Sequence, residues 1–279
     1  MKSRAFVIGH PIAHSRSPLI HGYWLERYGL EGSYERVDVP PDDLPAFLAG
    51  MGDSGFTGGN VTIPHKEATL RLVAEATPRA RRLGSVNTLW LEDGRLLGDT
   101  TDGEGFLASV TAAVGPDWQA GMRNAVVLGA GGAARAIVGA MLDLGLPRIT
   151  VANRTEARAR DLAGLSPERI GVVHWGALPD ALASADLLVN TTQAGMKGQL
   201  PLAVDLAPLP GRAIVADIVY VPLETELLAS ARARGLRALD GLGMLLHQAV
   251  PGFERWFGVR PEVTPELRAL VEADIRKAS

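Results

Sequence analysis

A lysine and an aspartate each follow a predicted strand, and together they could move a proton to and from an oxygen atom. Lys66 comes after the segment Asn60–Ile63, and Asp102 lies in the loop after the segment Arg95–Leu97. Ligands of open α/β sheets bind outside the carboxyl ends of the strands. The amide side chain of Asn87 is expected near the end of another strand. An ammonium group can give a proton and take it back as an amine, while a nearby carboxylate holds it in place. An ordinary surface lysine is the alternative interpretation of Lys66.

Hydroxyl and amide side chains at other strand ends could bind the polar groups of a small substrate. Ser15 and Ser17 alternate ahead of a predicted helix that begins at Pro18, so both hydroxyls can face one small anion such as a carboxylate. Simple capping of that helix by Ser17 is the alternative. Asn60 and Thr62 likewise share one face of a predicted strand.

A glycine-rich turn links a buried strand to an amphipathic helix, as in dinucleotide-binding loops. The strand Val126–Leu128 runs into Gly129-Ala130-Gly131-Gly132-Ala133, and apolar residues then recur at helical spacing. Gly129 permits the tight turn, and Gly131 lets backbone N–H groups approach a pyrophosphate at the positive end of the helix. A βα turn that binds no ligand is the alternative.

The residues after the second strand of this unit indicate which dinucleotide would bind. An NAD enzyme has Asp or Glu there, about 20 residues after the first glycine, to bind the ribose 2′-hydroxyl. This sequence has Asn153-Arg154-Thr155 at that position, followed by Arg158. Two arginines four positions apart at the start of a helix can both reach a 2′-phosphate. The pattern favours NADP over NAD, and a solvated helix face is the alternative.

Short apolar runs alternate with helical patterns along the chain, which indicates an α/β architecture. The first part is expected to form strands at Ala5–Ile8, Tyr34–Val39 and Asn60–Ile63, helices at Pro18–Tyr28 and Leu44–Met51, and a hairpin of Thr88–Leu91 and Arg95–Leu97. Six buried strands, the number in a complete dinucleotide-binding sheet, are expected at Val126–Leu128, Ile149–Ala152, Val172–Trp175, Leu187–Asn190, Ile214–Asp217 and Arg237–Leu239. The helices Leu245–Trp256 and Pro265–Lys277 are expected to pack back on the first domain.

Composition excludes several classes of function. Lys plus Arg is 28 against 31 for Asp plus Glu, a formal net charge of −3, which provides no basic field for nucleic acid or an anionic membrane. No cysteine is present, which excludes disulfides and thiolate chemistry and fits a cytoplasmic protein. No signal peptide or membrane span is predicted.

His10, His14 and His21 suggest zinc only weakly, so no metal site is predicted. Several of the 32 glycines, including Gly58 and Gly59, are expected at strand ends.

The sequence resembles the shikimate dehydrogenase family over almost its whole length. Seven segments carry the resemblance in the family's order: His14–Pro18, Asn60–Lys66, Val86–Thr88, Thr101–Gly103, Gly129–Ala133, Asn153–Thr155 and Gly241–Leu245. The resemblance implies an N-terminal α/β substrate domain of residues 1–104, completed by C-terminal helices in residues 242–279. It implies a Rossmann-type NADP-binding domain of residues 105–241 and an active site in the cleft between the two domains. The implied reaction is the reversible reduction of 3-dehydroshikimate to shikimate in chorismate and aromatic amino acid biosynthesis.

The resemblance also assigns roles to individual residues. It makes Lys66 and Asp102 the catalytic pair. Substrate binding is expected at Ser15, Ser17, Asn60, Thr62, Asn87, Tyr220 and Gln248. NADP binding is expected at Gly129, Ala130, Gly131, Gly132, Ala133, Asn153, Arg154, Thr155, Arg158, Thr191, Ile218 and Gly241. The expected partner is a small molecule, shikimate or 3-dehydroshikimate, and the expected assembly is a monomer or a homodimer.

Three residues depart from the family's usual pattern. Thr100 stands where the family commonly has asparagine, Gln193 where a small residue or proline is usual, and Ile218 where a methionine often packs on the nicotinamide. Two alternative functions stay open: a quinate/shikimate dehydrogenase of broader specificity, and a non-catalytic nucleotide-sensing relative. The intact pair of Lys66 and Asp102 favours an enzyme over a sensor.

Overall fold

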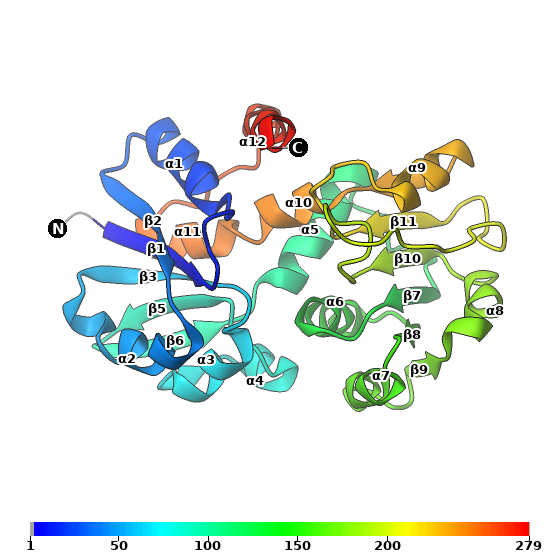
Figure 1. Ribbon diagram of the computed structural model, residues 1–279, viewed down its shortest axis with the longest axis horizontal. Coiled ribbons are helices and arrows are strands. Elements are labelled where there is room, and N and C mark those ends of the chain that lie inside the picture. The colour runs from blue at the N-terminus through cyan, green and yellow to red at the C-terminus, as the bar shows by residue number, and fades with distance from the viewer. Residues whose placement is uncertain (1–2, 279) are drawn as a thin grey trace. The chain divides into compact units, whose positions relative to one another are not determined.

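The computed structural model describes residues 3–278, which divide into two compact units (Figure 1). The first unit comprises the chain up to Asp102 together with Gln248–Val271, and the second comprises Gly103–His247 and the chain from Glu272 onward. The chain therefore leaves the first unit after Asp102, returns to it at Gln248 and leaves it again after Val271. Residues 1, 2 and 279, which the predicted domain limits include, lie outside the described residues.

The first unit is built on a mixed six-stranded sheet. Its strands are β1 (Ser3–Gly9), β2 (Gly32–Asp38), β3 (Phe56–Val61), β4 (Glu75–Ala76), β5 (Thr88–Glu92) and β6 (Arg95–Asp99), in the order β2-β1-β3-β5-β6-β4. The strands β1, β2 and β3 are parallel, and β5 pairs antiparallel with both β3 and β6. The predicted hairpin is thus present and extends the sheet beyond its parallel half.

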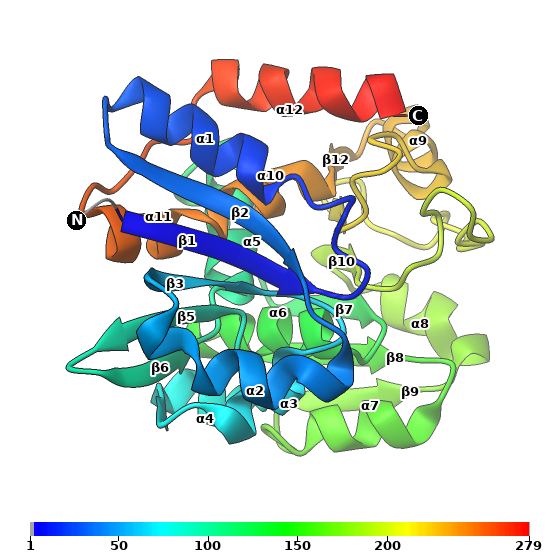
Figure 2. The ribbon, with the colours of Figure 1, turned by 60° about the vertical axis from the view of Figure 1, so that its left-hand side comes forward.

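Side chains of β1 point alternately to two apolar layers, because successive residues of a strand face opposite sides of the sheet. Ala5 and Val7 belong to a core with α11, whereas Phe6 and Ile8 belong to a core with α2. Figure 2 shows α1 and α11 on one face of the sheet and α2 and α3 on the other. The helices of this unit are α1 (Ser17–Arg27), α2 (Leu44–Ala49), α3 (Lys66–Leu72), α4 (Pro78–Leu83) and α11 (Val250–Phe257), and α12 (Pro265–Ala278) follows them.

The structure corrects two predicted elements. The strand expected at Asn60–Ile63 is β3, and it lies earlier because Gly58 and Gly59 are inside it. An added Cβ would lie 2.3 Å from the Trp256 ring at Gly58 and 2.3 Å from the Phe6 ring at Gly59, so these glycines make room for aromatic rings and do not mark a strand end.

The second correction concerns the single helix expected at Leu245–Trp256, which is two helices, α10 (Gly241–His247) and α11. Pro251 explains the break, since its ring would clash with the carbonyl of His247 in a continuous helix.

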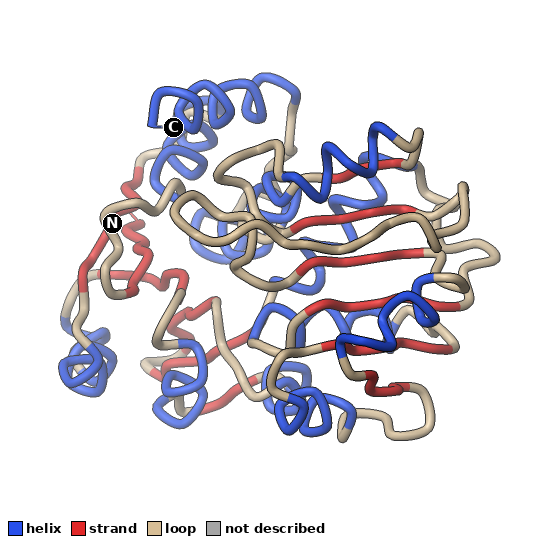
Figure 3. Tube along the Cα trace, turned by 45° about the vertical axis from the view of Figure 1, so that its right-hand side comes forward, coloured by secondary structure: helices blue, strands red, loops and turns tan. Residues whose placement is uncertain are grey.

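The second unit has the parallel sheet of a dinucleotide-binding fold (Figure 3). Its strands are β7 (Asn124–Leu128), β8 (Arg148–Ala152), β9 (Ile170–Val173), β10 (Leu187–Asn190), β11 (Ile214–Asp217) and β12 (Arg237–Leu239). They are all parallel, and their order is β12-β11-β10-β7-β8-β9. This is the strand order of a complete Rossmann fold, so the predicted fold class is confirmed. The third strand was expected at Val172–Trp175, but β9 ends at Val173. Trp175 instead begins a short 3₁₀ turn.

Helices cover both faces of this sheet. They are α5 (Asp102–Val114), α6 (Gly132–Asp143), α7 (Glu156–Ala163), α8 (Leu178–Leu182), α9 (Glu226–Ala233) and α10. Ala125 and Val127 of β7 pack with α5, α6 and α7, while Val126 and Leu128 pack with α8 and α9. Because both faces of β7 are buried, its sequence is a continuous apolar run and not an alternating one. Among the helices of residues 3–278, none has the length and apolar content needed to cross a membrane.

His21, one of the three histidines that suggested zinc, is buried among aromatic rings of the first unit. Its ring stacks on Tyr34 at a centroid distance of 3.9 Å and lies beside Trp24, Phe253 and Trp256. Neither ring nitrogen has a hydrogen-bond partner among the described residues, and burial lowers the pKa of His21 to about 3. Residues 3–278 contain no group of three or more His, Asp or Glu placed to hold a metal ion.

Replacing His21 with phenylalanine is expected to reduce the sensitivity of folding to acid. Between pH 6.5 and pH 3 the unfolded chain binds a proton on His21 that the folded chain does not bind, so the free energy of unfolding falls as the pH falls. The loss amounts to about 1.4 kcal/mol per pH unit, or about 2 kcal/mol between pH 7 and pH 5. Urea unfolding at both pH values measures it. His14→Phe, at an exposed histidine, is the control, and an unchanged pH dependence in His21→Phe would contradict the expectation.

Candidate active site

Lys66 and Asp102 form an ion pair in the first unit. Lys66 is the first residue of α3, and Asp102 is the first residue of α5. The Lys66 Nζ lies 2.5 Å from Asp102 Oδ2, and the two side chains are 22% and 9% exposed. The lysine therefore remains accessible to a ligand while the carboxylate is nearly buried. This places the two groups singled out from the sequence within direct contact of each other.

The segment before Lys66 is fixed by a buried histidine. His65 is 1% exposed, and its Nε2 donates to the carbonyl of Val39 at 2.7 Å. The carbonyl of Lys66 accepts the N–H of Val86 at 3.0 Å, next to Asn87. The backbone on both sides of this lysine is thus bonded to neighbouring segments, which limits where its side chain can reach.

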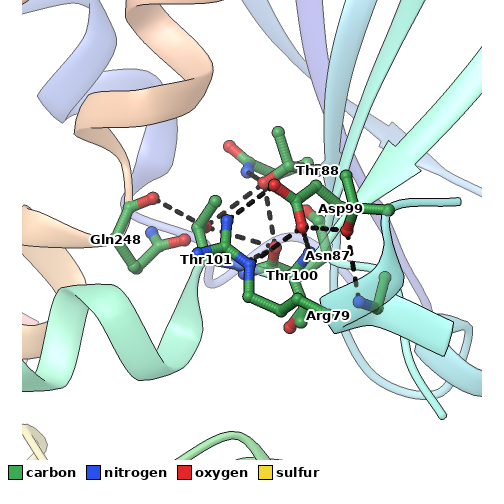
Figure 4. A network of polar contacts seen from close by, with 10 residues as sticks. Arg79, Asn87, Thr88, Asp99, Thr100, Thr101 and Gln248 are labelled. Atoms are coloured by element: carbon green, nitrogen blue, oxygen red, sulfur yellow. Dashed lines mark hydrogen bonds and ion pairs between the residues drawn. The ribbon is translucent and has the colours of Figure 1, made fainter. Parts of the chain in front are cut away.

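Asn87 connects Asp102 to the adjacent threonines. Its Nδ2 donates to Asp102 Oδ1 at 2.7 Å, while its Oδ1 accepts the Thr101 N–H and the Thr88 hydroxyl, both at 2.9 Å. Thr101 also donates its hydroxyl to the carbonyl of Gln248 at 2.9 Å (Figure 4). Asp102 therefore has both carboxylate oxygens engaged, one by Lys66 and one by Asn87, and its orientation is fixed.

A second buried carboxylate holds the end of β6, three residues before Asp102. Asp99 is 4% exposed and accepts bonds from the Thr77 hydroxyl at 2.5 Å, from Arg79 at 2.6 Å and from the Thr100 N–H at 2.7 Å (Figure 4). Burial raises the pKa of the Asp99 carboxyl, but the bonds from Arg79 and Thr77 outweigh it and bring the pKa below its usual value. Asp99 is therefore ionised at neutral pH and anchors the loop that carries Asp102.

Tyr34 is a member of this polar network that sequence reasoning missed. Its hydroxyl donates to Asn60 Oδ1 at 2.6 Å, and Asn60 Nδ2 donates to the carbonyl of Asn87 at 3.2 Å. Tyr34 and Asn60 are 8% and 5% exposed. Tyr34 is the one buried residue of the mostly polar strand β2, and a single aromatic residue in a strand carries no sign in the sequence that its hydroxyl bonds to Asn60.

The other predicted substrate residues lie in separate segments. Ser15 and Ser17 come together ahead of α1, with their hydroxyls 3.3 Å apart, and Arg16, not Ser17, occupies the cap position of the helix. Thr62 lies just past β3, where its N–H still bonds to the carbonyl of Ile8. Gln248 follows α10 and belongs to the first unit, whereas Tyr220 belongs to the second.

The glycine-rich loop of the second unit has the geometry of a phosphate-binding turn. Gly129 has a φ of +107°, which disfavours other residues, and Gly131 is the cap residue of α6. A Cβ on Gly131 or Gly132 would meet no atom of the described residues within 4 Å. Packing of the chain on itself therefore does not require glycine there. The open space above the backbone leaves room for a ligand to approach it closely, so the loop from Gly129 to Ala133 fits a dinucleotide pyrophosphate.

The predicted 2′-phosphate residues follow β8. Both arginines were expected at the start of a helix, but only Arg158 is helical. The helix α7 begins after the cap residue Thr155, so Arg154 precedes it. Asn153 Nδ2 donates to the carbonyl of Thr155 at 2.8 Å and fixes this turn. Both arginines are exposed, and neither guanidinium makes a hydrogen bond or ion pair within residues 3–278. Two unengaged cations at the end of the second strand fit a bound phosphate.

Three further predicted cofactor residues lie at the same edge of the sheet. The Thr191 hydroxyl donates to the carbonyl of Leu128 at 2.7 Å, beside Gly129. The Ile218 N–H donates to the carbonyl of Asn190 at 3.0 Å, and the N–H of Gly241 donates to that of Val219 at 3.1 Å. The loops after β7, β10, β11 and β12 therefore meet at the carboxyl end of the sheet, where ligands of such sheets bind.

Two of the departures from the family's pattern, Thr100 and Gln193, lie outside the contacts of the ion pair. Thr100 is 1% exposed, and its hydroxyl has no hydrogen-bond partner in the described part of the chain. The backbone N–H of the neighbouring Thr101 supplies a bond to Asn87. Gln193 is exposed in the loop after β10. Neither substitution removes a contact of Lys66 or Asp102.

Three protein-family models match the chain in succession. Residues 7–89 match the shikimate dehydrogenase substrate binding domain, residues 115–197 match the shikimate / quinate 5-dehydrogenase family, and residues 241–270 match the shikimate 5′-dehydrogenase C-terminal domain. Together they account for more than half of the chain.

Individual proteins are similar over almost the whole length. A shikimate dehydrogenase (NADP(+)) of Methylobacterium radiotolerans is 62% identical over 275 residues, which cover 98% of this chain and 97% of that protein. The crystal structure of shikimate 5-dehydrogenase from Thermus thermophilus in complex with NADP(H) and shikimate has a TM-score of 0.86 at 38% identity, covering 99% and 100% of the two chains. Quinate dehydrogenase from Corynebacterium glutamicum in complex with NAD has a TM-score of 0.89 at 32% identity, covering 98% and 99%.

Proposed function

The chain belongs to the shikimate dehydrogenase family, and from that premise we propose that it catalyses the reversible, NADP-dependent reduction of 3-dehydroshikimate to shikimate. The observation that carries the proposal is the contact of Lys66 with Asp102, whose second oxygen is bonded to Asn87. A sensor that only binds nucleotide has no need of such a proton-transfer pair. We assign residues 1–104 with the C-terminal helices in 242–279 to the substrate and residues 105–241 to NADP.

Reduction of a ring ketone needs a hydride at carbon and a proton at the oxygen that becomes a hydroxyl. NADPH supplies the hydride when it is bound. Lys66 donates the proton from Nζ to the developing alkoxide, and it takes the proton back in the direction of oxidation. Asp102 holds the lysine at 2.5 Å and accepts a hydrogen bond from the reacting hydroxyl. Asn87 keeps the carboxylate turned toward this task.

A cyclohexene carboxylate with several hydroxyls needs one anion site and several neutral partners. We assign the carboxylate to the paired hydroxyls of Ser15 and Ser17, which lie 3.3 Å apart ahead of α1. The hydroxyls and amides assigned to the ring hydroxyls are those of Asn60, Thr62, Asn87, Tyr220 and Gln248. A site of this kind rejects analogues that leave a buried polar group unpaired.

The residues expected to hold NADP fit that cofactor. The exposed backbone of Gly131 and Gly132 at the start of α6 suits the pyrophosphate, and the unengaged guanidinium groups of Arg154 and Arg158 suit a 2′-phosphate. Thr191, Ile218 and Gly241 would line the remainder.

A matrix of two substrates and two cofactors tests the proposed function. Shikimate or quinate is combined with NADP or NAD, and reduced nicotinamide is followed by its absorbance. We expect kcat/KM to be highest for shikimate with NADP. Comparable values for quinate would indicate the broader dehydrogenase, and binding of NADP without turnover in any combination would indicate the nucleotide sensor.

The cellular location and the oligomeric state are also proposals. We assign the protein to the cytoplasm, because it lacks cysteine and because its substrate is a biosynthetic intermediate. A monomer and a homodimer are both compatible with the proposed chemistry, since each subunit carries its own Lys66 and Asp102.

A further inference from the structure

A buried polar pair in the second unit stands at the edge of the sheet where the cofactor loops meet. Asp217 is the last residue of β11 and is 2% exposed, and Asn190 is the last residue of β10 and is fully buried. The two residues are register partners in neighbouring parallel strands. Asn190 Nδ2 donates to Asp217 Oδ1 at 2.9 Å. The proposed mechanism uses neither side chain.

The pair bonds to the loop that follows each strand. Asp217 Oδ1 also accepts the N–H of Val219 at 3.0 Å, and Oδ2 accepts the Thr225 hydroxyl at 2.8 Å. Asn190 Oδ1 accepts both the N–H and the hydroxyl of Thr192, at 3.0 and 2.7 Å. The loops 191–195 and 218–225 are therefore tied to one buried centre and to each other.

A carboxylate in this position is costly for the fold. The described residues bring no cation against Asp217, and burial raises its pKa although three neutral donors oppose that change. A buried charge without a partner cation is a poor source of stability. A fully bonded polar network, in contrast, fixes one arrangement of the segments that it joins.

Those segments contain the expected cofactor residues. Thr191 follows Asn190 directly, and its hydroxyl reaches the carbonyl of Leu128 beside Gly129. The N–H of Ile218 bonds to the carbonyl of Asn190, and the N–H of Gly241 bonds to the carbonyl of Val219. A change in the buried pair would consequently displace several of the residues assigned to NADP.

We propose that Asp217 and Asn190 are positioning residues that hold the loops 191–195 and 218–225 in the arrangement that binds the dinucleotide. The inference rests on the proposed function, because it takes NADP as the ligand of these loops. The buried pair would then contribute to the affinity for NADP, although neither side chain touches the substrate.

The test is equilibrium binding of NADP to the full chain, measured by calorimetry alongside steady-state kinetics. Asp217→Ala and Asn190→Ala are expected to raise the Kd and KM for NADP by about ten- to hundredfold, because each leaves buried donors or acceptors unpaired. The kcat at saturating NADP should fall by less than about threefold. Asp217→Asn keeps an oxygen for Asn190 and Val219, so its Kd should stay within about threefold of the unaltered value.

Asp186→Ala is the matched control. Asp186 is also a buried carboxylate of this sheet, but it precedes β10 at the opposite end and bonds to the N–H groups of Arg123 and Asn124 and to Arg212. Its loss should lower the Tm without raising the Kd for NADP.

Two results would overturn the inference. One is an unchanged Kd in Asp217→Ala and Asn190→Ala, and the other is an equal rise in Asp186→Ala, which would mean that general loosening of the sheet is responsible. If Asp217→Ala does not fold, Asn190→Ala and Thr225→Val carry the same comparison. Failure of the unaltered chain to bind NADP would overturn the proposed function as well, so the two failures are distinguishable.

Discussion

Lys66→Ala is expected to lower kcat by about a thousandfold while the Kd for shikimate changes by less than about fivefold. The Lys66 Nζ contacts Asp102 Oδ2 and can give a proton, and alanine leaves no acid in its place. The hydroxyl and amide groups assigned to the substrate are unaffected by the change, so the ground-state complex persists. The kcat is measured from reduced nicotinamide absorbance at saturation, and the Kd by calorimetry.

Lys277→Ala, at an exposed lysine of α12, is the control for loss of a positive charge and should leave both constants unchanged. A kcat for Lys66→Ala close to that of the unaltered enzyme would remove Lys66 from the mechanism. A parallel loss of shikimate binding would instead make it a binding residue. Unfolding of the variants by urea separates either result from a loss of folded protein.

The second unit could be predicted from the sequence in nearly all its strands because it follows a single physical rule. Every strand of a parallel sheet covered on both faces is a short apolar run, and each is separated from the next by helical spacing. Val126–Leu128 and Ile214–Asp217 are examples, and both lie in strands of the structure. The glycines of the loop after β7 then predicted where a ligand would meet this sheet.

The first unit was harder to predict where tertiary contacts decide the local structure. Gly58 and Gly59 suggest a turn, and only the rings of Trp256 and Phe6, far away in sequence, explain why they lie within β3. The residues that could be assigned to the site carry charges or amides in family motifs, such as Lys66, Asp102 and Asn87. Tyr34 could not be assigned, because its value to the site is one hydrogen bond to Asn60 that no pattern in the sequence reveals.

Arg154→Ala combined with Arg158→Ala is expected to raise the KM for NADP by about ten- to hundredfold and to change the KM for NAD by less than about twofold. NAD lacks the 2′-phosphate, so a guanidinium that bonds only to that group contributes to one cofactor and not to the other. Both side chains are exposed and unengaged within residues 3–278, so their removal costs the folded chain no internal bond. Initial rates with saturating shikimate and varied cofactor give both constants.

Arg160→Ala distinguishes selective recognition from a general effect of positive charge. Arg160 lies on the same helix, two residues beyond Arg158, but its guanidinium is paired with Glu156 at 2.7 Å. We therefore expect the ratio of the two KM values to stay as in the unaltered enzyme. An equal loss for NADP and NAD in the double variant would mean that the arginines do not read the 2′-phosphate. The cofactor preference would then have to come from the glycine loop or from the shape of the ribose pocket, because no Asp or Glu occupies the position of Asn153.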